Sequence, residues 1–308
     1  MTRRMLPPLL AAVMALCGCS VRHFALNQVG DALAGSGTTF SSDDDPDLVR
    51  AAVPFSLKLM EAVLAESPRH EGLLLAAASG FTEYSYAFVQ EDADELEAKD
   101  LAGAEALRTR ARRLYLRARD YGLRGLDVRH AGFSARLRAK PSAAVAGAKS
   151  GDVPLLYWTA AAWASAIAIS KDNPDLIADL PIVEAMMQRA LELDERFGDG
   201  AIHSFFITYE MIRPTGTGDA SPRAKPHLDR ALELAGGHLA GPWVSWAEDV
   251  CVTRQDYVGF RHAIQQALAV NPDAKPEWRL MNLVMQRRAR WLAGRAEELF
   301  LKTDADAK

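Results

Sequence analysis

Two cysteines stand one residue apart near the start of the chain, and their spacing allows several kinds of chemistry. Cys17 and Cys19 could form a metal or disulfide pair, follow a membrane span or mark a processing site. The uncharged run before them, Met5 to Leu16, is shorter than the ~20 apolar residues that a membrane-spanning helix needs. Arg3 and Arg4 precede that run, as in the basic start of a secretory signal. The segment therefore favours a processing site.

The residues around Cys19 match a bacterial lipobox. Such a motif places leucine three positions before the modified cysteine and a small residue directly before it, and Leu16 and Gly18 occupy these positions. Cys17 is an uncommon occupant of the position between them. It does not fit as the modified residue, because bulky Leu16 would then stand at the cleavage point. We predict that residues 1–18 are a lipoprotein signal peptide and that Cys19 is lipidated. An ordinary cleaved signal or a short anchor is the alternative.

Processing as a lipoprotein would determine the cellular compartment of the protein. Ser20 stands where an aspartate often retains lipoproteins at the inner membrane, so we expect a periplasmic protein that is lipid-anchored to the outer membrane. Removal of residues 1–18 leaves Cys251 without a second internal cysteine, so we expect no disulfide framework and no zinc site of the CxxC type. The protein must then be stable through its hydrophobic core, for which ~290 residues are enough.

The residue types that commonly carry catalysis or metal binding form no recognisable motif. The seven histidines are scattered, and neither HExxH nor GxSxG is present. Alternating aspartates over 43–47 invite a calcium hypothesis, but an EF-hand loop needs glycine and glutamate where this chain has Leu48 and Pro54. Asp45 is better interpreted as the cap of a helix that Pro46 opens. We expect no enzyme activity, no metal and no cofactor.

Charged residues gather in two stretches of opposite sign. The acidic stretch 91–100 is interpreted as a solvated helix rather than an acidic site. The basic stretch 108–140 would suggest nucleic acid in the cytoplasm. Outside the inner membrane that target is absent, so we expect no nucleic-acid binding. Two interpretations remain for this stretch: arginine stems that cover apolar helix flanks, or a surface for an acidic protein, an anionic lipid or a ligand.

The elements that must position these residues are predicted to be helices throughout. Alanine is abundant and runs of β-branched residues are almost absent, which favours helix. Apolar residues recur at helical spacing. The expected helices cover 46 to about 66, about 70 to 97, about 101–122 and 155–170. The expected loops cover 35–42, 141–153 and 213–223, and residues 19–42 are expected to form a lipid-proximal tether.

A pattern of residues recurs in several of these helices. A small or medium residue is followed four positions later by a larger one and three positions further by another small or medium one. The copies are Ser56-Met60-Val63, Ala111-Tyr115-Ala118, Val183-Met187-Ala190, Ala224-Leu228-Ala231 and Phe260-Ile264-Ala267. The spacing is typical of the second helix of tetratricopeptide repeats, although the first-helix signature is missing. We predict one α-helical domain over 43–302, an irregular tetratricopeptide-like repeat array, with a non-repetitive helical bundle as the alternative.

Aromatic residues suggest where such an array would bind a ligand. The concave side of a repeat array commonly binds partners. The candidate lining is Phe81, Tyr84 and Phe88 with Tyr157 and Trp158. Apolar walls with a few phenol hydroxyls suit an amphipathic organic molecule. We therefore expect an elongated, mainly apolar cleft or pore there, whereas the alternative is that all five are plain core residues.

The whole chain after Cys19 resembles the T component of TRAP transporters, the TatT-like lipoproteins. The resemblance is carried by the lipobox and by residues 43–90, 113–127, 152–170, 190–206 and 287–292, the last of which read RRARWL. It implies an all-helical protein with irregular tetratricopeptide-like repeats in the periplasm. It further implies association with a substrate-binding P subunit, a homotrimer with a cleft or pore, and passage of a small hydrophobic ligand.

Two functions are therefore compared. The first is a lipid-anchored, non-enzymatic TRAP-transporter accessory that docks the P subunit and conducts a small hydrophobic ligand. The second is a general periplasmic tetratricopeptide-like lipoprotein scaffold for envelope assembly.

Overall fold

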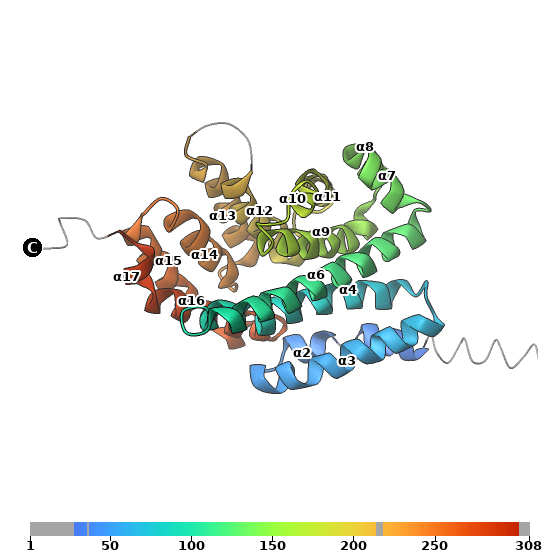
Figure 1. Cartoon of the computed structure of the whole chain (residues 1–308), viewed down its shortest axis with the longest axis horizontal. Coiled ribbons are helices and arrows are strands. Elements are labelled where there is room, and N and C mark those ends of the chain that lie inside the picture. The colour runs from blue at the N-terminus through green and yellow to red at the C-terminus, as the bar shows by residue number, and fades with distance from the viewer. Residues whose placement is uncertain (1–27, 36, 214–217, 302–308) are drawn as a thin grey trace, which may run out of the picture.

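The chain folds into helices that pack side by side over its whole described length (Figure 1). The computed structural model describes residues 28–35, 37–213 and 218–301, so the predicted signal peptide and Cys19 lie outside the described residues. Within these ranges the structure contains helices and turns but no β-strand. The predicted all-α class is confirmed, while the repeat interpretation stays a prediction.

The first half of the chain contains the longest helices. A helical segment over 28–34 precedes them. The elements that follow are α2 (Gly37–Ser41), α3 (Pro46–Glu66), α4 (Glu71–Ser85), the π-helical turn η1 (Tyr86–Gln90), α5 (Glu91–Leu96), α6 (Leu101–Arg129), α7 (Phe133–Ala139), α8 (Pro141–Val145) and the 3₁₀ turn η2 (Ser150–Asp152).

Shorter helices form the second half. They are α9 (Val153–Ala168), α10 (Pro174–Ile177), α11 (Leu180–Leu193), η3 (Phe197–Asp199), α12 (Ala201–Ile212), α13 (Ser221–Ala235), α14 (Gly241–Ser245), the second π-helical turn η4 (Trp246–Cys251), α15 (Tyr257–Ala269), η5 (Pro272–Ala274), η6 (Pro276–Trp278), α16 (Arg279–Gly294) and α17 (Ala296–Leu299).

Helix α6 lies between α4 and α9, and two glycines allow its close contact with α9. A Cβ atom at Gly122 would lie 2.0 Å from the Thr159 hydroxyl oxygen, and one at Gly125 would lie 2.7 Å from a Leu155 methyl group. Residues with a Cβ would push the two helices apart. The hydrophobic cores on either side of α6 can therefore meet around its small residues.

The recurrent sequence pattern falls on the buried face of every helix that carries it. In the copy on α6, Ala111, Tyr115 and Ala118 are fully buried. The other copies are buried as well, except that Ser56 on α3 is half-buried. The pattern therefore identifies core-facing positions, whether or not the helices form true repeats.

Several predicted boundaries need correction. The stretch 35–42, expected as a loop, contains α2, and the stretch 141–153 contains α8 and η2. Helix α6 continues to Arg129 instead of ending near residue 122. The predicted cap of α3 is confirmed, because the Asp45 carboxylate accepts hydrogen bonds from the amides of Asp47 and Leu48. The short helices α2 and α8 could not be predicted, because a helix of five residues is too short to show apolar residues repeating at helical spacing.

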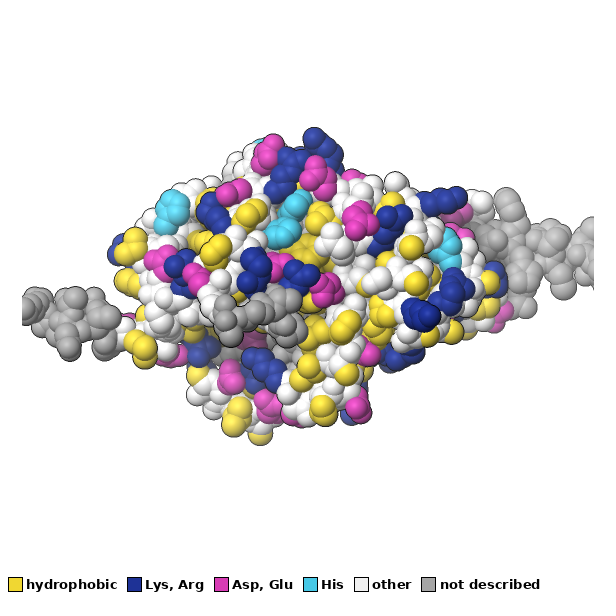
Figure 2. Space-filling model, turned by 90° about the horizontal axis from the view of Figure 1, so that it is seen from above, with side chains coloured by type: hydrophobic (Ala, Val, Ile, Leu, Met, Phe, Trp, Pro, Cys, Tyr) yellow, Lys and Arg dark blue, Asp and Glu magenta, His cyan; other side chains and the backbone are white. Residues whose placement is uncertain are grey.

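The surface mixes charges of both signs. On the face in Figure 2, Lys and Arg side chains lie beside Asp and Glu, with apolar side chains between them. In the part of the chain that the structure describes, no helix combines the length and the apolar character needed to cross a membrane.

Candidate functional site

Acidic residues stand within or directly after two π-helical turns of the chain. In η1 the Glu91 amide donates to the Tyr86 carbonyl, and after η4 the Val252 amide donates to the Ala247 carbonyl. Each bond spans five residues, one more than in an α-helix. Such turns are frequent at functional sites. Glu91 directly follows η1, and η4 contains two further acidic residues.

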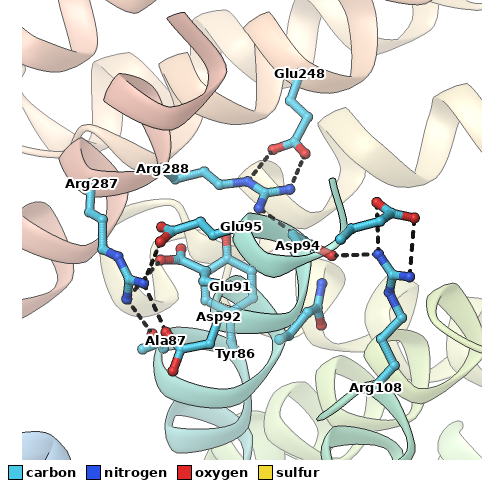
Figure 3. Close-up of polar contacts among 12 residues, drawn as sticks. Tyr86, Ala87, Glu91, Asp92, Asp94, Glu95, Arg108, Glu248, Arg287 and Arg288 are labelled. Atoms are coloured by element: carbon cyan, nitrogen blue, oxygen red, sulfur yellow. Dashed lines mark hydrogen bonds and ion pairs between the residues drawn. The ribbon is translucent and has the colours of Figure 1, made fainter. Parts of the chain in front are cut away.

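Arg288 of α16 lies between the two π-turn regions (Figure 3). Its guanidinium donates to Asp94 at 2.9 Å and through Nε to Glu248 at 3.1 Å, with a second, shorter contact to Glu248. The side chain is 9% exposed. A buried guanidinium needs such partners, because an isolated charge in the interior is strongly unfavourable.

The neighbouring arginine extends this network. Arg287 donates to Asp92 and Glu95, each at 2.8 Å, and Asp92 also accepts from Arg50 of α3. The pKa of Asp92 is lowered: burial would raise it, but the bonds from the two arginines outweigh burial. The prediction that residues 91–100 form a solvated helix is therefore wrong for the inward half of the stretch. Two of its partners, Arg287 and Arg288, stand almost 200 residues away in the sequence.

Glu91 lies beside this network without sharing its hydrogen bonds. Its side chain is 1% exposed, and Arg287 approaches only to 4.0 Å. Neither carboxyl oxygen has a hydrogen-bond partner among the described residues. Burial raises the pKa of Glu91 to about 8, so the group is mainly protonated at neutral pH. Burial and the nearby Glu91 also raise the pKa of Tyr86 well above its ordinary value.

Glu83 of α4 lies one helical turn before Tyr86. Water reaches its side chain, yet burial by the surrounding protein raises its pKa to about 7. Tyr157 of α9 is half-buried, and its pKa is raised by burial and by the charge of Glu83. The two side chains therefore lie near each other.

Asp249 of η4 occupies a similar environment. It is half-buried and accepts a hydrogen bond of 2.5 Å from the Thr208 hydroxyl of α12. Burial, followed by the charge of Glu248, raises its pKa to about 7. We call Glu83, Tyr86, Tyr157 and Asp249 the inner polar row. Of these, Glu83 and Tyr157 lie near each other. The four members are two carboxyl groups and two phenols, which can form hydrogen bonds with a ligand.

The structure separates the five predicted cleft residues into two groups. Phe81, Tyr84 and Phe88 are buried in the core formed mainly by α3, α4 and α6. Tyr157 and Trp158 are both half-buried and their rings meet edge to face at 5.1 Å between centroids. Only Tyr157 belongs to the inner polar row. Ligand binding by any of the five stays a prediction.

Sequence reasoning missed the acidic members of the row. Glu83 is the only charged residue between Glu71 and Glu91, in an otherwise apolar helix. This isolated charged residue could have been recognised from the sequence as a candidate site residue. Asp249 had no comparable signal, because its environment depends on the contact between α12 and η4.

Two of the scattered histidines also meet. Nδ1 of His203 on α12 lies 2.9 Å from Nδ1 of His227 on α13, and burial lowers both pKa values. At least one ring must therefore be neutral and accept the bond. Among the described residues, no group of three or more His, Cys, Asp or Glu side chains is arranged to hold a metal ion.

Comparison with known proteins gives the architecture its context. The chain is 26% identical over 309 residues to an uncharacterized protein of Treponema pallidum (strain Nichols), and the match covers 94% of this chain and 96% of that protein. The family model of the TRAP transporter T-component matches residues 42–300, which include every helix from α3 to α17. The chain therefore belongs to the TRAP transporter T-component family.

Proposed function

We propose that the chain is a lipid-anchored periplasmic accessory of a TRAP transporter that docks the substrate-binding P subunit and holds a small ligand along the inner polar row. The family match supports the transport role. The observation that carries the ligand role is the group of aromatic rings formed by Tyr157, Trp158 and Phe197, which lies next to the Glu83 carboxyl group.

The chemistry of the row defines the class of ligand. Tyr157 contacts Trp158 and the ring of Phe197, at 5.1 and 5.0 Å between centroids. Aromatic walls next to phenol and carboxyl groups fit an amphipathic organic molecule whose polar end forms hydrogen bonds. The role is one of binding and transfer without a catalytic step.

Filling the row should prevent ligand binding. Glu83→Trp places a large ring at a position that solvent reaches, so the fold can accept it. We expect the neutral fluorescent dye Nile red to bind this variant ~10-fold more weakly than the wild type, as measured by fluorescence titration. Glu83→Gln is the matched control, since it removes the charge but not the space. Equal dye binding by the wild type and Glu83→Trp would contradict a ligand space at this row.

The anchor is proposed from the lipobox, with the outer membrane as the location. Cys19→Ser should release the protein from the membrane fraction and leave an unprocessed precursor, whereas Cys17→Ala should leave the mature product unchanged. Fractionation followed by mass spectrometry of the N-terminus measures both results. A Cys19→Ser protein that still carries lipid would show that another residue is modified. The homotrimer implied by the family resemblance remains part of this proposal.

A further inference from the structure

Four exposed arginines form a row along one face of α6. They are Arg110, Arg113, Arg117 and Arg124, at spacings of three, four and seven residues. This spacing places them on the same side of the helix. At 1.5 Å of rise per residue the row is about 21 Å long. We call these four residues the arginine row.

Three of the four arginines in the row lie over aromatic rings. The guanidinium carbons of Arg110, Arg117 and Arg124 lie 5.9, 5.4 and 5.3 Å from the ring centroids of Tyr84, Phe81 and Tyr121. Two of these rings also stack, with their centroids 6.0 Å apart. Stacking restricts the long side chains before any partner arrives, so less conformational entropy is lost on binding.

Little negative charge balances the row. Arg113 has no hydrogen bond or ion pair with any described residue. Arg117 lies 3.5 Å from Glu61, which already accepts hydrogen bonds from two other side chains. Asp120, on the same face, pairs with Arg119. The row thus remains positive although the whole chain has a net charge of −4.

The arginine row also borders a surface hollow that contains apolar side-chain atoms. A shallow surface hollow of about 420 Å³ is lined by Arg113, Arg117 and Arg124 together with Leu116, Tyr121 and Asp120, the carboxylate that pairs with Arg119. An apolar side chain can enter such a hollow while carboxylates next to it reach the guanidinium groups. Guanidinium binds carboxylate through two parallel hydrogen bonds, which favours a protein partner with Asp or Glu.

We propose that the arginine row docks an acidic segment of the P subunit, in which carboxylates flank one apolar side chain. The inference rests on the proposed function and adds the docking surface and the chemistry of its partner. It also gives a second role to Phe81 and Tyr84, which support the guanidinium groups from the core side.

The test measures binding of the purified P subunit of the same transporter to the wild type and to Arg113→Glu/Arg117→Gln. We expect the double variant to bind ~10-fold more weakly or worse, and the wild-type affinity to fall as salt is raised. Arg261→Glu/Arg290→Gln changes the net charge by the same amount. Its Arg261 is also exposed over an aromatic ring, at 5.9 Å from the Tyr257 centroid. This control should bind within ~2-fold of the wild type.

Single replacement of Arg113 by Glu guards against misfolding, because this exposed side chain has no hydrogen bond or ion pair with a described residue to lose. If the wild type and both row variants bind the P subunit equally, the row is not the docking surface, although the proposed function stands. If the wild type does not bind the P subunit at all, the proposed function and this inference both fail. If the row variants lose binding only to phosphatidylglycerol-containing vesicles, the row contacts membrane and the inference is overturned.

Discussion

At the residue scale, the interior polar groups divide into two classes by their partners. Arg287 and Arg288 bind carboxylates directly, and the pKa of one of these, Asp92, is lowered by its arginine partners. Glu91, Glu83 and Asp249 have raised pKa values, and burial is the largest cause in each case. Groups of the second class exchange protons near neutral pH, which is the property expected of side chains that meet a ligand rather than hold the fold.

Glu91 gives a prediction at this scale. Its pKa rises from 4.5 in the unfolded chain to about 8 in the folded protein, so the folded state keeps a proton that the unfolded state releases. The free energy of unfolding should therefore fall as the pH rises from about 4.5 to about 8, by on the order of 3–5 kcal/mol. Glu91→Gln should lack this fall, as measured by urea unfolding at several pH values.

The control for this measurement is Glu277→Gln, which changes an exposed carboxylate. It should follow the wild-type pH dependence. A Glu91→Gln protein with the same pH dependence as the wild type would show that Glu91 is ionised in the folded state.

At the element scale, close packing of α6 and α9 depends on Gly122. Its Cβ, if present, would lie 2.0 Å from Thr159 Oγ1 and 3.3 Å from the Thr159 backbone. Gly122→Ala should lower the free energy of unfolding by ~1–3 kcal/mol, because the clash outweighs the gain of ~1 kcal/mol in helix propensity. Gly294→Ala, in α16 with no atom within 4 Å of its Cβ, should not be destabilised. Equal unfolding midpoints in the two variants would contradict the close contact.

The elements also show what could be predicted from the sequence. The start of α3 was readable, because Asp45 and Pro46 act within a few residues of each other. The π-helical turn η1 was not, since nothing local distinguishes YAFVQ from an ordinary helix. The partners of residues 91–100 were equally hidden, because they come from α3, α6 and α16. Local signals therefore identify helices and caps, whereas the inner polar row depends on contacts between distant helices.

At the scale of the whole molecule, α16 joins the two ends of the chain. It packs against α2 and α3 from the beginning and against α14 and α15 from the end. Arg288 continues this connection in the interior, because it binds Glu248 of η4 and Asp94 of α5. The central groups are thus held by helices from both halves, and their arrangement should fail when this link is removed.

Replacing Arg288 by Ala tests this link. The substitution leaves Glu248 without its guanidinium partner and removes one of the two that Asp94 contacts. Breaking a buried ion pair on one side typically costs ~3–5 kcal/mol, and we expect a loss of this size in urea unfolding. Arg290→Ala, two residues away on the same helix but exposed, should stay within ~0.5 kcal/mol of the wild type. If the two variants are equally stable, charge pairing by Arg288 does not hold the halves together, and apolar packing of α16 must provide the connection.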